Sequence, residues 1–421
     1  MRVCFLLPEL GRSGGVSVVR GHAERLAERG FEAELVIAGP AAAAGPAVDV
    51  PVLALEQARG RRYEVALATW WTTAAALYEL DAARRALFVQ SLEQQWYRGH
   101  EQSDGLLAAL PLELPVSFIA VGAGQREALA RLRPDAPCHL APNGIDKMIF
   151  SPSRREGRTG PLRVLVEGQP TIWLKGVQDA VRAVRAMSEP AHLTAVALDP
   201  EGLDALEADA TRSGLAPSEM AELYAQSDVL LKLSRVEGLG LAPLEAMHTG
   251  LPCVVTPFTG YRDYVEHGRN GLVVGFDDLP GTTRWLDLLA RDRDLLGRLG
   301  RGAELTARGW PDRERSSDLL GEALRAIAAA AEPAPEPALA GLLARVRLAA
   351  ELGRNREGAL RWNEEALGQA RALVEELSRS RDDCAEMLER ARREQAVLNS
   401  SRLYRALRRA RRTAKVRRLW P

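Results

Sequence analysis

Cysteine and histidine are scarce in this sequence. Its 421 residues hold four cysteines, Cys4, Cys138, Cys253 and Cys384, and six histidines. The cysteines lie far apart and form no Cys-x-x-Cys pair, which excludes a disulfide framework and favours a reducing compartment. The histidines have no spacing typical of metal ligands, so we expect no structural metal site.

Long hydrophobic runs are also missing. The first apolar run, residues 2–7, is too short for a secretory signal peptide and ends at Pro8. No run approaches the ~18 apolar residues that a membrane-spanning helix needs. We therefore expect a cytoplasmic protein. Lysine is rare beside alanine and arginine, a composition typical of a bacterium with a GC-rich genome.

The chain has no net charge, but the charges are unevenly placed. Lysine plus arginine and aspartate plus glutamate each number 56. Residues 401–421 hold nine basic residues and no acidic one, which leaves 47 basic against 56 acidic residues in the rest. An acidic body with a basic end indicates a tail that binds an anionic partner.

The basic tail, residues 401–421, has a narrow apolar edge. Leu403, Leu407, Ala410 and Ala414 recur at helical spacing, and Trp420 follows them. This pattern is typical of a helix lying on an anionic membrane surface. Nucleic acid is the rival partner of an arginine run, but no nucleic-acid-binding fold accompanies it, so we predict membrane and no nucleic acid. The alternative is an unstructured basic tail.

The first third of the chain alternates short apolar runs with helical patterns. A helix is predicted over 15–30, where apolar residues share one face. Strands are predicted over 2–7, 32–38, 64–69, 85–90 and 116–121. This alternation predicts a parallel sheet with helices on both faces.

The same pattern restarts after a segment rich in proline, glycine and charge, residues 141–161. A helix is predicted over 175–187, and strands over 162–168, 191–198, 228–233, 252–257 and 271–275. The sequence therefore predicts two doubly wound Rossmann-like domains, 1–145 and 146–330. A cleft between two such domains, at the carboxyl ends of their strands, is the expected ligand site.

A third region follows a Pro/Ala linker over 331–338. Residues 339–400 contain no predicted strand and carry a weak heptad pattern, which Ser380 and Glu394 interrupt. A coiled coil that permits a homodimer is one interpretation. A self-packed helical hairpin is the other.

The segment SRVEGLGLAPLEAMHTG, residues 234–250, reads as the loop and helix that leave a buried strand. Gly238 and Gly240 let the backbone approach an anion, and the helix start favours one. Glu237 lies at the mouth of the loop, and Glu245 is expected in the first helical turn. Together, the two glutamates and the glycine-rich loop could hold a sugar, a diphosphate and a ribose. The ordinary alternative is a helix stabilised by a first-turn glutamate.

This segment resembles the E-x7-E signature of the retaining glycosyltransferases of family four, which have the GT-B fold. The resemblance extends to MAELYAQSDVLLKLS (220–234), TGYRDYVEHGRNGLVV (259–274), PNGID (142–146) and residues 11–36, and so covers about residues 1–330. It implies a transfer of sugar from a nucleoside-diphosphate sugar to an acceptor hydroxyl with retention of configuration.

The resemblance also implies roles for individual residues. Glu237 would bind the donor sugar, Glu245 the ribose and Lys175 the diphosphate, with Glu237 and Lys175 as the catalytic pair. Asn143 and Gly144 would form the hinge. The backbone lining of the donor site would come from Gly14, Gly15, Gly238, Leu239, Gly240 and Leu241.

Two positions depart from the family. Gln169 stands where the family usually has an arginine, so Lys175, the helix start or Arg235 must neutralise the donor. Gln90 and Glu93, in FVQSLE, stand near the place of a histidine on the acceptor side. FVQ followed by glutamate resembles a bacterial branch with rhamnosyltransferases of surface polysaccharides.

We therefore expect a glycosyltransferase that uses no cofactor and no essential metal. Its acceptor is expected to be a glycan or lipid-linked hydroxyl, at the inner face of the cell membrane. The leaving diphosphate oxygen would accept the acceptor proton, because the sequence offers no protein nucleophile near the sugar. The alternatives are a non-catalytic assembly subunit of the same fold, which Gln169 favours, and another sugar-nucleotide enzyme.

Overall fold

The computed structural model describes residues 1–11, 13–39, 47–97, 102–153, 159–331 and 339–352. The basic tail, residues 401–421, and most of the predicted coiled-coil region, from 353 to 400, lie outside the described residues. Among the helices of the described ranges, none has the length and apolarity needed to cross a bilayer.

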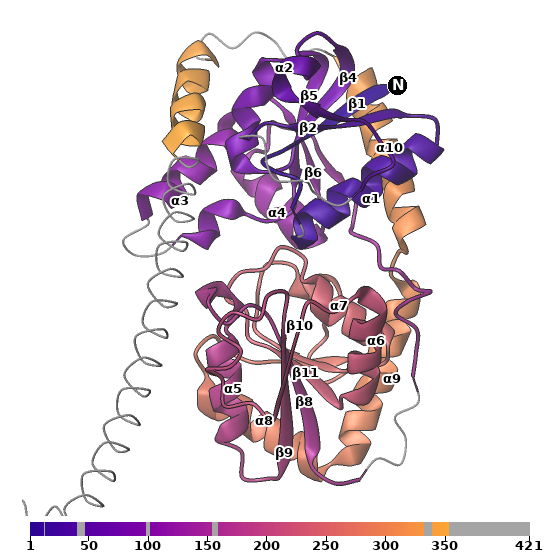
Figure 1. Cartoon of the computed structure of the whole chain (residues 1–421), viewed down its shortest axis with the longest axis vertical. Helices are drawn as coiled ribbons and strands as arrows, with labels where there is room; N and C mark the ends of the chain where they lie inside the picture. The colour runs from indigo at the N-terminus through magenta and orange to yellow at the C-terminus, as the bar shows by residue number, and fades with distance from the viewer. Residues whose placement is uncertain (12, 40–46, 98–101, 154–158, 332–338, 353–421) are drawn as a thin grey trace, which may run out of the picture. The chain divides into compact units, whose positions relative to one another are not determined.

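The first domain is built on a parallel sheet of seven strands with the order β3-β2-β1-β4-β5-β6-β7. Figure 1 shows helices on both faces of it. The strands are β1 Arg2–Leu7, β2 Glu32–Ile37, β3 Val52–Ala54, β4 Arg62–Ala68, β5 Asp81–Val89, β6 Ser117–Ala120 and β7 Cys138–Leu140. The helices are α1 Gly14–Glu28, α2 Leu55–Ala58, α3 Gln102–Ala109 and α4 Ala123–Leu132, with shorter turns η1 Trp71–Tyr78, η2 Glu93–Trp96 and η4 Leu110–Glu113.

The second domain repeats this architecture with six parallel strands in the order β10-β9-β8-β11-β12-β13. The strands are β8 Leu162–Glu167, β9 Ala191–Ala197, β10 Ala210–Ser213, β11 Val229–Lys232, β12 Cys253–Val255 and β13 Gly271–Val273. The helices are α5 Val177–Arg185, α6 Pro217–Gln226, α7 Leu241–His248, α8 Leu279–Arg291, α9 Arg293–Gly309 and α10 Arg313–Ala329, with turns η5 Trp173–Lys175 and η6 Tyr261–Asp263.

Both predicted sets of strands are confirmed, and so is the doubly wound class. The central strands form because their residues are apolar on both faces, as a sheet covered by helices on two sides requires. In β1, five of the six residues are buried, and in β11 all four are. The sequence did not predict β3, β7 and β10, which are short and lie at sheet edges.

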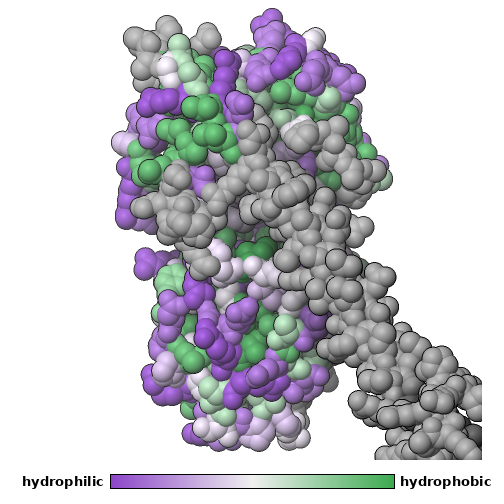
Figure 2. All heavy atoms as spheres, turned by 60° about the vertical axis from the view of Figure 1, so that its left-hand side comes forward, coloured by the Kyte–Doolittle hydropathy of each residue, from purple (hydrophilic) through white to green (hydrophobic). Residues whose placement is uncertain are grey.

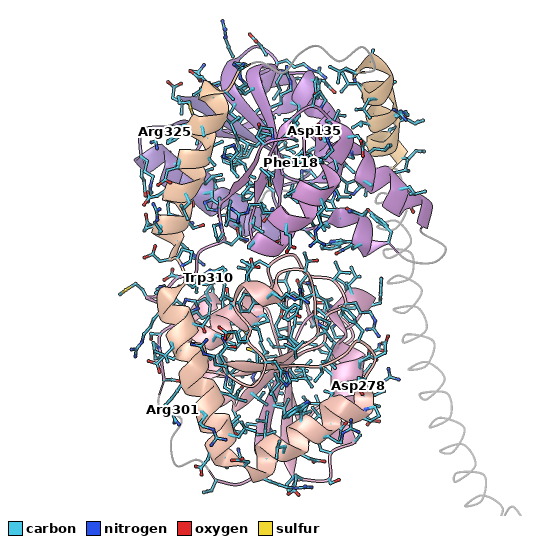
Figure 3. All side chains as sticks on the ribbon, turned by 180° about the vertical axis from the view of Figure 1, so that it is seen from behind. Phe118, Asp135, Asp278, Arg301, Trp310 and Arg325 are labelled. Atoms are coloured by element: carbon cyan, nitrogen blue, oxygen red, sulfur yellow. The ribbon has the colours of Figure 1, made fainter. Side chains whose placement is uncertain are left out.

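Helix α10 belongs to the first domain in space. The sequence division placed residues up to 330 in the second domain, but α10 packs against α1 and against β4 to β7. Figure 3 shows it running from Trp310 along the first domain to the turn that bears Arg325. Leu320 and Leu324 are fully buried there. The sequence analysis predicted no helix for this segment and gave no signal of which sheet it covers.

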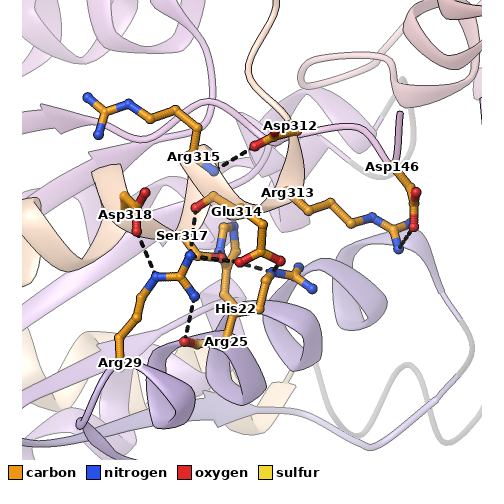
Figure 4. Close-up of polar contacts among 10 residues, drawn as sticks. All are labelled: His22, Arg25, Arg29, Asp146, Asp312, Arg313, Glu314, Arg315, Ser317 and Asp318. Carbon is orange, nitrogen blue, oxygen red and sulfur yellow. Dashed lines mark hydrogen bonds and ion pairs between the residues drawn. The ribbon is translucent and has the colours of Figure 1, made fainter. Parts of the chain in front are cut away.

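Ion pairs join α1 and α10 on the outer side of this contact (Figure 4). Arg29 pairs with Asp318 at 2.7 Å and with Glu314 at 2.8 Å. His22 Nδ1 and Ser317 Oγ lie 2.9 Å apart. Partly exposed ion pairs contribute about 0–1 kcal/mol each, whereas each buried leucine contributes about 1.5–3 kcal/mol. The apolar face of α10 therefore dominates the attachment.

Residues 339–352 form a helix that packs on the first domain. Val346, Ala349 and Ala350 are each 1% exposed, and Ala349 clusters with Trp71 and Ala108. Leu106, Leu348 and Leu352 remain exposed. Figure 2 shows hydrophobic side chains gathered on this face of the first domain. The start of the predicted helical region thus extends the first domain.

Candidate active site

The glycine-rich loop, residues 234–240, connects β11 to α7. Gly240 adopts a left-handed conformation, with φ 81°. A Cβ at Gly240 would lie 2.8 Å from the ring of Phe258 and from the Tyr264 hydroxyl, so only glycine fits here. The Tyr264 hydroxyl lies 3.0 Å from the Leu239 carbonyl oxygen and 2.8 Å from that of Gly240. The loop is therefore held in one conformation at the start of α7.

Within the described residues, the N–H groups of Gly238, Leu239 and Gly240 donate no hydrogen bond. They lie just before the N-terminus of α7, where partial positive charge gathers. This arrangement can bind an anion such as a diphosphate.

Glu237 is held by cations. Its Oε1 atom accepts from Lys175 Nζ at 2.9 Å and from Ser234 Oγ at 3.0 Å, and Lys232 Nζ lies 3.4 Å away. Burial opposes its ionisation, but Lys232 and Lys175 outweigh burial and lower its pKa to about 2. Its Oε2 atom accepts no hydrogen bond from any described residue. Glu237 is thus an ionised carboxylate with one oxygen left for a ligand.

Lys232 is a site residue that sequence reasoning missed. It ends β11 and is 2% exposed. Its Nζ atom donates to Glu167 Oε2 at 2.5 Å and to the Glu167 carbonyl at 3.0 Å. Burial disfavours its charge, but Glu167 and Glu237 raise its pKa. The only signal was a lysine in a strand whose other residues are all apolar.

Glu245 does not lie where the sequence placed it. It is the fifth residue of α7, one turn in, and no acidic residue occupies the first turn. Burial, and next the charge of Glu167, raise its pKa to about 8, although Arg313 and a hydrogen bond with Tyr224 act in the other direction. Its carboxyl is therefore protonated at neutral pH and can both donate to and accept from a diol. The helix-dipole argument for Glu245 was wrong.

Gln169 and Arg235 make contacts inside the second domain. Gln169 Nε2 donates to the Glu201 carbonyl at 2.9 Å, and its Oε1 accepts from the Asp199 N–H at 3.3 Å. Arg235 pairs with Asp179 at 2.6 Å and also with Asp277. Gln169 carries no charge, and the Arg235 guanidinium is already paired with two carboxylates. Neither side chain therefore supplies a free positive charge for a nucleotide-sugar donor in this conformation.

The first domain brings Gln90 to the loop, and Gly15 lies beside the Gln90 side chain. The Gln90 amide lies against Gly15, where a Cβ would be 3.2 Å from Nε2. A Cβ on Gly238 would overlap the Gln90 carbonyl oxygen. Gly14 is the first residue of α1, behind the Ser13 cap. Glu93 instead points into the first domain, where its Oε2 accepts from the Trp71 N–H at 2.7 Å.

The predicted hinge is one of two crossing segments. Asn143 and Gly144 run beside Trp310 and Asp312, where the chain returns to the first domain. The Trp310 indole donates to the Asn143 carbonyl at 2.9 Å, and Ile145 forms a parallel bridge with Asp312. A Cβ on Gly144 would overlap the Asp312 carbonyl oxygen, so glycine permits the crossing.

Two Rossmann-like domains, each built on a parallel sheet, and a last helix, α10, that packs back on the first domain define the GT-B fold. Residues 162–288 match the family model described as Glycosyl transferases group 1. The matched segment includes the glycine-rich loop and its glutamates and lysines: Glu167, Lys175, Lys232, Glu237 and Glu245. No group of three His, Cys, Asp or Glu side chains among the described residues is arranged to hold a metal ion.

Curated relatives match parts of the chain. N-acetyl-alpha-D-glucosaminyl L-malate synthase of Bacillus anthracis is 37% identical over 84 residues, which cover 20% of this chain and 22% of that protein. MMP alpha-(1->4)-mannosyltransferase of Mycolicibacterium hassiacum is 29% identical over 209 residues, or 47% of this chain and 45% of that protein. The matches thus span less than half the length of these relatives.

Solved structures share the fold over most of the chain. The structure of HepE from Anabaena in complex with UDP-glucose superposes with a TM-score of 0.63. It is 16% identical and covers 77% of this chain and all of that chain. At this identity the likeness shows the GT-B fold.

Proposed function

We propose that the protein is a retaining glycosyltransferase. It moves a sugar from a nucleoside-diphosphate sugar to a hydroxyl of a glycan or lipid-linked acceptor, in the synthesis of a cell-surface polysaccharide or glycolipid. The observation that carries this proposal is the cluster of Lys175, Lys232 and Glu237 beside the unpaired amides of the glycine-rich loop. The cluster offers positive charge for a diphosphate and a carboxylate oxygen for a sugar.

The roles follow from charge and position. Lys175 and the start of α7 neutralise the diphosphate, so the proposed reaction needs no cofactor and no essential metal. The Oε2 atom of Glu237 accepts from sugar hydroxyls, and the neutral carboxyl of Glu245 holds the ribose diol. Lys232, which is buried, acts by keeping Glu237 ionised.

The proposed transfer occurs on one face of the sugar. The bond between the anomeric carbon and the diphosphate oxygen breaks, and a bond from that carbon to the acceptor oxygen forms on the same face. The acceptor proton passes to the departing diphosphate oxygen. The protein contributes orientation and charge stabilisation of an oxocarbenium-like state.

A transfer assay tests this function. Purified full-length protein is incubated with UDP-, GDP-, ADP- and dTDP-sugars, dTDP-rhamnose included, and with a glycolipid extract as acceptor. We expect acceptor-dependent release of one nucleoside diphosphate in buffer containing EDTA, and a product that keeps the anomeric configuration by NMR. An inverted product, or release that needs added magnesium, would contradict the mechanism.

A non-catalytic assembly subunit is the second candidate. The observation in its favour is that Gln169 replaces a cation and Arg235 is neutralised by two carboxylates. Such a subunit would bind no nucleotide sugar and would release no nucleoside diphosphate. The transfer assay therefore separates the two functions.

Membrane attachment through residues 401–421 and a homodimer through residues 339–400 complete the proposal. The tail would place the enzyme at the inner face of the cell membrane, where lipid-linked acceptors lie. Flotation with phosphatidylglycerol vesicles, compared with a chain ending at residue 400, tests the attachment. Equal flotation of both chains would contradict it.

A further inference from the structure

Helix α4 of the first domain has no cap of its own. Its N-cap residue is Gly122, which has no side chain to accept the first amide hydrogens. Those hydrogens are taken by the second domain. Asp263, at the end of η6, accepts from the Ala123 N–H at 2.5 Å and from the Gly124 N–H at 3.1 Å.

Two glycines make room for this contact. A Cβ at Gly122 would lie 2.6 Å from Asp263 Oδ2 and 2.5 Å from Gln125 Oε1. A Cβ at Gly124 would overlap the Thr259 carbonyl oxygen. The segment 259–263 can approach α4 because neither residue has a side chain.

The contact is continuous with the glycine-rich loop. Gly260 packs on Gly238 and Leu239, where a Cβ would lie 2.7 Å from the Leu239 Cα. The hydroxyl of Tyr264, which follows Asp263, lies 3.0 Å and 2.8 Å from the carbonyl oxygens of Leu239 and Gly240. The residue that caps α4 therefore lies in the same short segment that fixes the loop beside Glu237.

The approach of the two domains, here called closure, also buries Gln125, the third residue of α4. Its side chain is fully buried, and both amide atoms lack a hydrogen-bond partner among the described residues. Its Nε2 atom faces Gly238, 3.1 Å from the place of a Cβ. An unpaired buried amide opposes closure, so closure needs an opposing interaction such as the Asp263 cap.

We propose that Asp263 is a positioning residue that holds the two domains closed by capping α4, and so fixes the 237–240 loop against the first domain for sugar transfer. Only the catalytic consequence rests on the proposed function. Loss of a helix cap changes a conformational equilibrium by about 2- to 30-fold. The ratio of open to closed molecules should rise by that factor when Asp263 is replaced by alanine.

The test compares Asp263→Ala, Asp263→Asn and Asp292→Ala. Asparagine keeps one of the two acceptor oxygens that Asp263 uses and so tests a partial cap. Asp292 is the matched control, because it caps α9 inside the second domain by accepting from the Leu295 N–H at 2.7 Å. Fluorophores on unnatural amino acids at exposed Leu106 and Leu198 report the interdomain distance by single-molecule energy transfer.

Asp263→Ala is expected to raise the ratio of open to closed molecules about 2- to 30-fold and to lower kcat by at most that factor, with nucleoside diphosphate affinity unchanged. Asp263→Asn keeps only one acceptor oxygen and should change the distance less than Asp263→Ala does, and Asp292→Ala should leave it unchanged. If Asp263→Ala does not fold, Gly122→Ser replaces it in this test. The serine hydroxyl would cap α4 directly, and the serine side chain would displace Asp263.

An unchanged distance distribution in Asp263→Ala and Gly122→Ser, or an equal change in Asp292→Ala, would overturn the proposal. The distance is measured without substrate. A wild-type protein that transfers no sugar would therefore refute the proposed function while the distance still decides the role of Asp263.

Discussion

The ammonium group of Lys175 lies 2.9 Å from the carboxylate of Glu237, and this pair joins η5 to the glycine-rich loop. The two residues are 62 positions apart in the chain. Lys175 ends η5, and the Gly176 that follows it is left-handed, with φ 61°. A Cβ at Gly176 would overlap the Leu233 carbonyl oxygen. The pair thus depends on a close approach of two backbones that only glycine allows.

Replacing Glu237 by glutamine should lower sugar transfer. The variant keeps the shape but loses the charge that pairs with Lys175 and Lys232. Hydrogen bonds to charged groups contribute about 1.5–3 kcal/mol, so kcat/KM should fall about 10- to 150-fold. Steady-state kinetics measure this, with Glu127→Gln as control because Glu127 lies on the surface of α4. An equal loss in both variants would contradict the role of Glu237.

The lowered pKa of Glu237 also predicts acid sensitivity. A carboxyl whose pKa falls from 4.5 to about 2 on folding stabilises the protein above pH 4.5. That contribution is lost as the pH falls from 4.5 towards 2. Urea denaturation between pH 7 and pH 2.5 should show a smaller acid loss in Glu237→Gln than in wild type. Parallel profiles would contradict the ion-pair account.

Glu245 should give the opposite pH dependence. Its pKa rises from 4.5 to about 8 on folding, so the folded state binds a proton that the unfolded state has released. Stability should therefore fall as the pH rises from 4.5 to 8, by at most about 1.4 kcal/mol per pH unit. Glu245→Gln should remove this fall, as urea denaturation at pH 5 and pH 8 can show. A fall that persists in the variant would refute a protonated Glu245.

The apolar contacts and the ion pairs that α10 makes should contribute differently to the stability of the protein. Leu324 is fully buried, so Leu324→Ala should destabilise the protein by about 2–5 kcal/mol. Arg29→Ala removes partly exposed ion pairs with Glu314 and Asp318 and should cost about 1 kcal/mol or less. Chemical denaturation compares them. A larger loss in Arg29→Ala would reverse our ranking of the two contacts.

Gly238 should tolerate no side chain in the closed state. A Cβ there would overlap the Gln90 carbonyl oxygen across the two domains, so Gly238→Ala should lower kcat while nucleotide binding by the second domain persists. Gly309→Ala is the control, since nothing lies within 4 Å of a Cβ at that position. Calorimetry and kinetics on both variants decide this. Full transfer activity in Gly238→Ala would contradict the closed geometry.

Much of the fold was predictable because its central strands are apolar on both faces and its helices alternate with them. The glycine-rich loop was also visible, since a strand, two glycines and a helix follow one another within 234–250. The edge strands β3 and β10 were not, because their residues are only partly buried. They carry too weak an apolar pattern to identify them.

The site was less predictable than the fold, because its chemistry depends on groups far apart in sequence. Glu245 is neutral owing to burial and to Glu167, which lies on another strand. Lys232 looked like part of an apolar strand, and only the structure shows it beneath Glu237. Arg235 looked like an available cation, and the structure pairs it with Asp179 and Asp277.

The proposed function depends on a nucleotide-sugar site at Lys175, Glu237 and Glu245. Isothermal titration calorimetry of wild type and Glu245→Ala against UDP, GDP, dTDP, ADP and their common sugars tests it most directly. We expect saturable binding of one nucleotide and its sugar by wild type, and a loss of that binding in the variant. A folded wild-type protein that binds none of them would contradict the account and favour the assembly subunit.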